Sequence, residues 1–147
     1  MGFIRLSETR DVPILEFLWR WKVATTAALG VRFFGGALRE VAYRRLKDLE
    51  AAKYIQCRPG SRGANFVWML DQKGFAVARG GLPELREEGF RSESIDHDLL
   101  VNAFHLGPWL SGAPERVDTF TEQELRRFHF EFYPQWVPRH ESHRPDG

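Results

Sequence analysis

Charged and aromatic side chains share one side of the segment 37–52, whose apolar pattern predicts a helix. Successive residues of a helix turn by about 100°, so side chains three or four positions apart lie on the same face. Arginine can hold guanine by two hydrogen bonds, and lysine, arginine and tyrosine bind phosphate oxygens. This face therefore predicts contacts with base edges and phosphates, and a solvated basic face on an ordinary helix is the alternative. The face consists of Arg39, Glu40, Tyr43, Arg44 and Lys47, the last of which is expected to meet only phosphate.

Two arginines flank a turn between the strand-like runs Tyr54–Arg58 and Asn65–Leu70. The linker PGSRGA is rich in proline, glycine and serine, which is typical of a β-hairpin loop. Arg58 and Arg62 lie on either side of the Pro-Gly-Ser turn, and such a loop can lie along a minor groove or against phosphates. A polar turn without a partner is the alternative. Arg32, in the preceding part of the chain, is a further candidate for a phosphate contact.

The charge of the chain is unevenly distributed. Its 147 residues include 21 lysines and arginines and 20 aspartates and glutamates, a net charge of +1. Residues 1–91 carry a net +6 and residues 92–147 a net −5. A basic half on a nearly neutral chain favours a polyanionic partner, and chance together with solvated helix faces is the alternative.

Apolar periodicity, caps and turn residues predict the elements that must hold these side chains. The first part of the chain is expected to contain helices at 9–22, from Thr25 or Thr26 to Phe33, and at 37–52, the strands Tyr54–Arg58 and Asn65–Leu70, and a helix at 71–79. A fifth helix is expected at 94–106, followed by a strand at 117–120 and a short helix at 121–128.

Single residues within these elements have expected roles. Asp11 is expected to cap the first helix, with Pro13 in its first turn, and Asp71 to cap the fourth. Arg45 borders the apolar stripe of the third helix, so we expect its stem to pack and its guanidinium to reach solvent. The alternation in residues 66–70 predicts one well-buried face of that strand. The stripe of the third helix consists of Leu38, Val41, Ala42, Leu46 and Leu49.

The predicted order of helix, helix, helix, strand, strand, helix is that of a winged helix-turn-helix. We therefore expect an α+β fold with three helices plus a β-hairpin wing, an added C-terminal helix and a short αβ tail. The expected units are a winged-helix DNA-binding domain at 9–80, an added helix at 93–110 and an αβ extension at 115–147.

Three segments resemble known proteins. Residues 41–55, VAYRRLKDLEAAKYI, resemble the recognition helix and first wing strand of many bacterial winged-helix regulators, and residues 68–78, WMLDQKGFAVA, resemble the strand and helix that follow the wing. Asp71 stands where a threonine is common, which exchanges one N-cap residue for another. The segment DHDLLVNAFHL at 96–106 resembles a motif of the replication-relaxation family, plasmid- and phage-associated winged-helix proteins, through His97, Leu99, Val101 and Asn102.

The resemblance implies a protein that binds double-stranded DNA, either sequence-specifically or generally. Such a protein acts as a transcriptional regulator, or as a replication or transfer accessory factor of a plasmid or phage. A winged-helix module for protein–protein interaction, with an incidental basic face, is the alternative.

The fifth predicted helix has a broad apolar face that must leave water. It either packs back on its own domain or pairs with a second copy, and two-fold symmetry would suit two DNA half-sites. We expect a homodimer through this helix. The dimerisation residues are expected to be Leu99, Leu100, Ala103 and Phe104.

The sequence favours neither an enzyme nor a metal site. It lacks a glycine-rich phosphate loop, G-x-S-x-G and H-E-x-x-H, so we expect no catalysis and no cofactor. His97 and His105 are about 12 Å apart along a helix, too far for one zinc ion, so His97 is expected to form a hydrogen bond or to pack. The single cysteine, Cys57, excludes a disulfide within the chain and fits a cytoplasmic protein, and no apolar run predicts a membrane span.

The last residues, Arg144-Pro145-Asp146-Gly147, resemble the start of the catalytic strand of PD-(D/E)xK nuclease-like domains. In that family the aspartate binds a metal ion together with a second acidic residue, and a lysine follows. Neither follows Asp146 here, and one carboxylate cannot hold a catalytic metal. An N-terminal fragment of such a nuclease-like enzyme is therefore kept as a further alternative.

Overall fold

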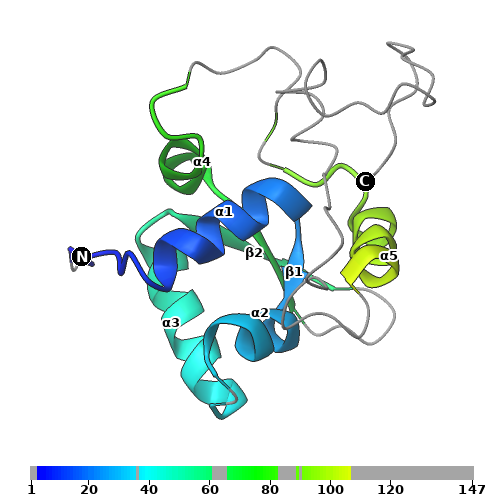
Figure 1. Ribbon diagram of the computed structural model, residues 1–147, viewed down its shortest axis with the longest axis horizontal. Helices are drawn as coiled ribbons and strands as arrows, with labels where there is room; N and C mark the ends of the chain where they lie inside the picture. Colours follow the sequence, from blue (N-terminus) through cyan, green and yellow to red (C-terminus); the bar gives the residue numbers. More distant parts are fainter. Residues whose placement is uncertain (1–2, 36, 61–65, 83–88, 90, 107–147) are drawn as a thin grey trace, which may run out of the picture.

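Five helices and a three-stranded sheet make up the described part of the protein (Figure 1), which is a computed structural model. The structure describes residues 3–35, 37–60, 66–82, 89 and 91–106, without the side chains of 103–106. The expected α+β class is confirmed, and the elements expected at 117–120 and 121–128, with the whole extension at 115–147, lie outside the described residues. In chain order the elements are α1 (Asp11–Trp21), β1 (Ala24–Thr25), α2 (Thr26–Phe33), α3 (Arg39–Ala51), β2 (Ile55–Pro59), β3 (Phe66–Leu70), α4 (Gln72–Ala78) and α5 (Ile95–Leu106).

The sheet is antiparallel, with β3 between β1 and β2. Trp68 on β3 lies opposite Ala24 on one side and Cys57 on the other. The sequence pattern does not predict β1, because a strand of two residues is too short to show an alternation. Its pairing nevertheless brings the start of α2 next to the central strand.

The main core lies between α1, α2, α3 and one face of the sheet (Figure 1). Trp68 and Leu70 point into it from β3, and Ile55 from β2. The buried indole of Trp68 donates a hydrogen bond of 2.8 Å to the Thr26 hydroxyl. Thr25 is then the residue that caps α2, since its hydroxyl accepts the Ala28 N–H at 3.1 Å.

The opposite face of β3 is also buried, where the sequence predicts only one buried face. Val67 and Met69 form a second cluster with Val23, and Ile95 and Leu99 of α5 pack against it. The side-chain amide of Asn102 donates a hydrogen bond of 2.5 Å to the Val23 carbonyl. Helix α5 therefore covers the second face of the sheet within the same chain.

Helix α4 closes the other end of the core. As expected, Asp71 is its N-cap, and the carboxylate accepts the Gln72 N–H at 2.8 Å. Gly74 lies against the chain that enters β2, where a β-carbon would stand 1.9 Å from the Tyr54 carbonyl oxygen. Only glycine permits this approach, because any side chain would push the helix away from the backbone.

The apolar stripe of α3 is shorter than predicted. Ala42, Leu46 and Leu49 are buried, but Leu38 is 75% and Val41 is 49% exposed. The helix begins at Arg39, with Leu38 as its N-cap residue. Its first turn projects beyond the core, so the apolar side chains there have nothing to cover them.

A buried ion pair joins the start of α1 to α3 and replaces two expected roles. Asp11 is the first residue of α1 instead of its cap, is fully buried and accepts the Ser7 N–H at 2.8 Å. The guanidinium of Arg45, whose side chain is 21% exposed, turns to Asp11 instead of extending into solvent: its Nη2 lies 2.5 Å and its Nε 3.2 Å from the two Asp11 carboxylate oxygens. Nη2 also donates to the Arg5 carbonyl at 3.1 Å. A local pattern cannot reveal this pair, because its members are 34 residues apart.

The charge state of Asp11 follows from these contacts. Burial by itself raises the pKa of this carboxyl, but hydrogen bonds from Arg45 and Ser7 and the nearby positive charges outweigh it. The net result is a pKa below the usual value for aspartate. The folded protein therefore keeps the carboxylate charged at pH values where the unfolded chain takes up a proton.

Replacing Asp11 by Asn is expected to lower the free energy of unfolding by about 3 kcal/mol, since it removes the closest and only buried counter-charge that Arg45 has among the described residues. Urea unfolding at neutral pH measures the loss. The matched control is Asp48→Asn, because Asp48 is 53% exposed and its contact with Arg45 is a longer one of 3.9 Å. This variant is expected to lose less than about 1 kcal/mol of unfolding free energy. Equal losses in the two variants would show that the buried pair contributes no more to stability than the exposed one.

The difference between the parent and Asp11→Asn is also expected to depend on pH. A lowered pKa contributes stability that is fully present above the unfolded-state value, about 4 for aspartate, and is lost as pH falls through the folded-state value. The same urea measurements at about pH 3 should therefore give a smaller difference than at pH 7. A difference that stays constant with pH would contradict the assignment of the charge to Asp11.

Candidate nucleic-acid interface

The residues predicted to contact nucleic acid on α3 form one exposed surface, here called the α3 face. The buried stripe of Ala42, Leu46 and Leu49 turns the remaining side chains outward. All the predicted residues are exposed, including the two in the first turn, which extends beyond the core. The α3 face consists of Arg39, Glu40, Tyr43, Arg44 and Lys47.

Three charged side chains of the α3 face have no partner among the described residues. Arg39, Glu40 and Arg44 form no ion pair or side-chain hydrogen bond with any residue that the structure describes. Two guanidinium groups are therefore available for a ligand from outside. A flat guanidinium suits guanine or phosphate, both of which offer paired acceptor atoms.

Lys47 is less available than the sequence predicts. Its ammonium group forms an ion pair with Glu50, one turn further along the helix, and this hydrogen bond raises the pKa of Lys47. Glu50 also accepts the backbone N–H of Cys57 at 3.2 Å, which holds the carboxylate between α3 and β2. Binding a phosphate would require Lys47 to leave this partner.

Tyr43 has a structural role besides any contact with a ligand. Its ring centroid lies 6.3 Å from that of Phe66 and 6.1 Å, edge-on, from that of Trp68. These contacts tie α3 to the hairpin of β2 and β3. Tyr43 is nevertheless 39% exposed, so one edge of the ring remains on the surface.

Phe66 is a surface residue that the sequence pattern places in the core. It alternates with Trp68 and Leu70, yet it is 44% exposed because the first residue of β3 extends past the helices. The sequence signal for this exposure is the position of Phe66, two residues after the predicted arginine-containing turn at 59–64. Phe66 and Tyr43 together form an aromatic strip between α3 and the hairpin.

The structure describes one of the two arginines of the hairpin. Arg58 is exposed on β2 opposite Val67, and its Nη1 donates to the neighbouring Cys57 carbonyl at 3.3 Å. Pro59 pairs with Phe66 at the end of the ladder, so Arg58 lies near the turn. Because it pairs with Val67, its side chain is on the face of the sheet opposite to the aromatic strip. Arg62 lies outside the described residues.

Arg32 is packed rather than free. Its guanidinium carbon lies 5.2 Å from the ring centroid of Phe17 and 5.7 Å from that of Phe33. Burial and the positive charge of Arg20 lower the pKa of Arg32. The group is half-buried, so it is a weaker candidate for a phosphate contact than Arg39 or Arg44.

Of the residues expected at a dimer contact, the two whose side chains are described differ in burial, so these two do not form one surface. Leu99 packs against Val67 and Met69 of its own chain, whereas Leu100 is 61% exposed. Ala103 and Phe104 belong to α5, and their side chains lie outside the described set. His97 is exposed and its Nδ1 lies 3.2 Å from a carboxylate oxygen of Asp98, which agrees with the expected hydrogen-bonding role.

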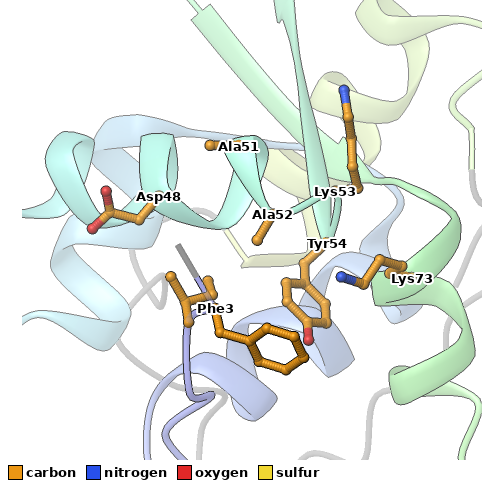
Figure 2. A pocket seen from close by; sticks show the side chains of 8 residues that line it. Phe3, Asp48, Ala51, Ala52, Lys53, Tyr54 and Lys73 are labelled. Carbon is orange, nitrogen blue, oxygen red and sulfur yellow. The ribbon is translucent and has the colours of Figure 1, made fainter. Parts of the chain in front are cut away.

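A hollow of about 470 Å³ opens at the C-terminal end of α3 (Figure 2). Its wall is mainly apolar, and the Nζ of Lys73 lies 4.6 Å from the ring centroid of Tyr54. Asp48 is the one carboxylate in its lining. Across the described residues, three or more potential metal ligands do not come together anywhere. The lining consists of Phe3, Ile4, Asp48, Ala51, Ala52, Lys53, Tyr54 and Lys73.

Cys57 is half-buried on β2, and burial raises the pKa of its thiol, which favours the protonated form. Within the described ranges, the structure has no helix of sufficient length and apolarity to span a membrane.

Comparisons with protein-family models, curated proteins and solved structures found no match to this chain.

Proposed function

We propose that the protein binds double-stranded DNA as a winged helix-turn-helix protein, with α3 as its recognition helix and the β2–β3 hairpin as its wing. The order of α1, β1, α2, α3, β2 and β3 and the sheet order β1-β3-β2 suit this fold. The observation that carries the proposal is the exposed pair Arg39 and Arg44, which lack partners among the described residues, on a helix whose opposite side is buried. A helix that presents such a face fits the major groove.

The biological role within this proposal is transcriptional regulation, or replication or transfer of a plasmid or phage. The resemblance of residues 96–106 to the replication-relaxation family supports the second group. Asn102, one of the residues that carry this resemblance, anchors α5 to the carbonyl of Val23. Such roles are carried out in the compartment that contains the DNA, in agreement with the cytoplasmic location expected from the sequence.

A protein–protein interaction module is the second candidate, and the exposed apolar residues at the start of α3 favour it. Leu38 and Val41 are both largely exposed, and exposed apolar patches are typical of protein interfaces. Binding to duplex DNA at two salt concentrations separates the two candidates. Neutralised phosphates release counterions, so affinity for DNA must fall steeply as salt rises.

The α3 face is tested by Arg39→Ala and Arg44→Ala. Each is expected to weaken binding by about 1–3 kcal/mol if the arginine holds a base by two hydrogen bonds. Fluorescence anisotropy with labelled duplex DNA measures the affinities. Arg5→Ala removes the same charge from the exposed N-terminal segment and should have little effect. If both α3 variants fold and bind like the parent, the helix face is wrongly assigned.

The wing is tested by replacing Arg58 and Arg62 together with alanine. Phosphate contacts do not depend on sequence, so affinity is expected to fall evenly for all duplexes. The slope of log affinity against log salt should flatten by about 2, one for each lost phosphate contact. Titrations at several salt concentrations give the slope, and a slope equal to that of the parent would remove the hairpin from the interface.

The homodimer is tested by Leu100→Glu. Leu100 is 61% exposed, so a charge there should leave the fold intact while breaking a contact between two copies of α5. Light scattering is expected to give a dimeric parent and a monomeric variant, with weaker DNA binding by the variant because two half-sites are no longer linked. A parent that stays monomeric at tens of micromolar would contradict the dimer.

A further inference from the structure

The acidic residues of α3 differ in one respect, which is whether they have a partner. Asp48 lies 3.9 Å from Arg45, and Glu50 pairs with Lys47 and with the backbone of Cys57. Glu40 is exposed and has no ion pair or hydrogen bond with any described residue. Within the described part of the chain it is therefore an unpaired negative charge, in the middle of a surface proposed to meet a polyanion.

The position of Glu40 decides which part of DNA it can meet. It stands in the first turn of α3, and the N-terminal residues of a recognition helix reach the base edges in the major groove. A carboxylate next to phosphate is repelled, but at the base edges it can accept a hydrogen bond from the N4 amino group of cytosine. Adenine also offers an amino group, but its N7 acceptor lies beside it and disfavours a carboxylate.

The apolar residues near Glu40 in the sequence also suit base edges rather than phosphates. Leu38 and Val41 are 75% and 49% exposed and offer no hydrogen-bond donor to a phosphate. Exposed apolar side chains in the major groove contact the methyl group of thymine. Arg44 follows Glu40 by one helical turn, about 6 Å along the axis, which places a guanine-binding group within one or two base steps of the carboxylate.

We propose that Glu40 is a specificity-determining residue, which selects a cytosine in the major groove beside the bases contacted by Arg44. This inference rests on the proposed function, because it names the base that the same surface prefers. Glu40 attracts no DNA by itself. It makes every other base at that position less favourable, because the carboxylate would then face acceptor atoms or lose its only donor.

A structural role for Glu40 makes a different prediction. The N-cap residue Leu38 supplies no side-chain hydrogen bond, and an acid in the first turn stabilises the positive end of a helix. In that case removing the charge lowers the thermal stability and leaves base preference unchanged. Thermal unfolding of each variant, followed by circular dichroism, is therefore measured beside binding.

The experiment selects duplexes from a random-sequence library with the full chain, then measures affinities for the selected duplex and for single base-pair changes. The variants are Glu40→Gln and Glu40→Ala, and the control is Glu16→Gln, which removes the same charge from the exposed side of α1. The parent is expected to prefer cytosine at one position by roughly 5- to 150-fold. Glu40→Gln should move that preference to adenine, since an amide both donates and accepts, and Glu40→Ala should lose it while binding unrelated duplexes more tightly.

The outcomes separate this inference from the proposed function. A parent that retains no duplex even at low salt overturns both. A parent that binds duplex DNA without base preference, or whose preference is the same in Glu40→Ala, overturns the role of Glu40 alone. Glu16→Gln must match the parent in preference; if it shifts the preference as Glu40→Gln does, the effect is one of net charge and the inference fails.

Discussion

Strand β3 is apolar on both faces, and the rest of the structure depends on covering it. Trp68 and Leu70 face the cluster formed with α1, α2 and α3, while Val67 and Met69 face the opposite way. A strand with two buried faces needs a layer on each side and a neighbouring strand at each edge, because exposed apolar surface and unpaired backbone groups both cost free energy. Helix α5 supplies the second layer, and β1 and β2 supply the edges.

Helix α3 is held from three directions, which leaves one side free. Leu46 and Leu49 bury its inner face, Arg45 binds the buried carboxylate of Asp11, and the ring of Tyr43 packs on the hairpin. Each contact comes from a different part of the chain. The helix therefore presents its exposed side in a fixed orientation, which the proposed contact with DNA requires.

The charges of α3 are divided along its length. In the C-terminal half, Arg45 pairs with Asp11 and Lys47 pairs with Glu50. In the N-terminal half, Arg39, Glu40 and Arg44 have no such partners among the described residues. Paired charges stabilise the helix and its contacts, whereas free charges are available to a ligand. The division supports the proposal that the first turns of α3 enter the groove.

The sequence by itself determined the features that depend on nearby residues. The spacing of Ala42, Leu46 and Leu49 predicts α3 and its buried side, and Asp71 marks the start of α4, because helix periodicity and capping act over a few positions. The class of fold and the exposure of Arg39 and Arg44 follow from the same local signals. The alternation along β3 likewise indicated an inward face.

Only the tertiary structure decided the features that join distant segments. The pairing of Asp11 with Arg45, the strand β1, and the docking of Asn102 on Val23 depend on residues that are 34 to 79 positions apart. The exposure of Leu38 also required the structure, since the periodic pattern alone places it in the core. Sequence patterns record which side chains share a face, but burial depends on what lies opposite that face, and this is decided when the whole chain packs.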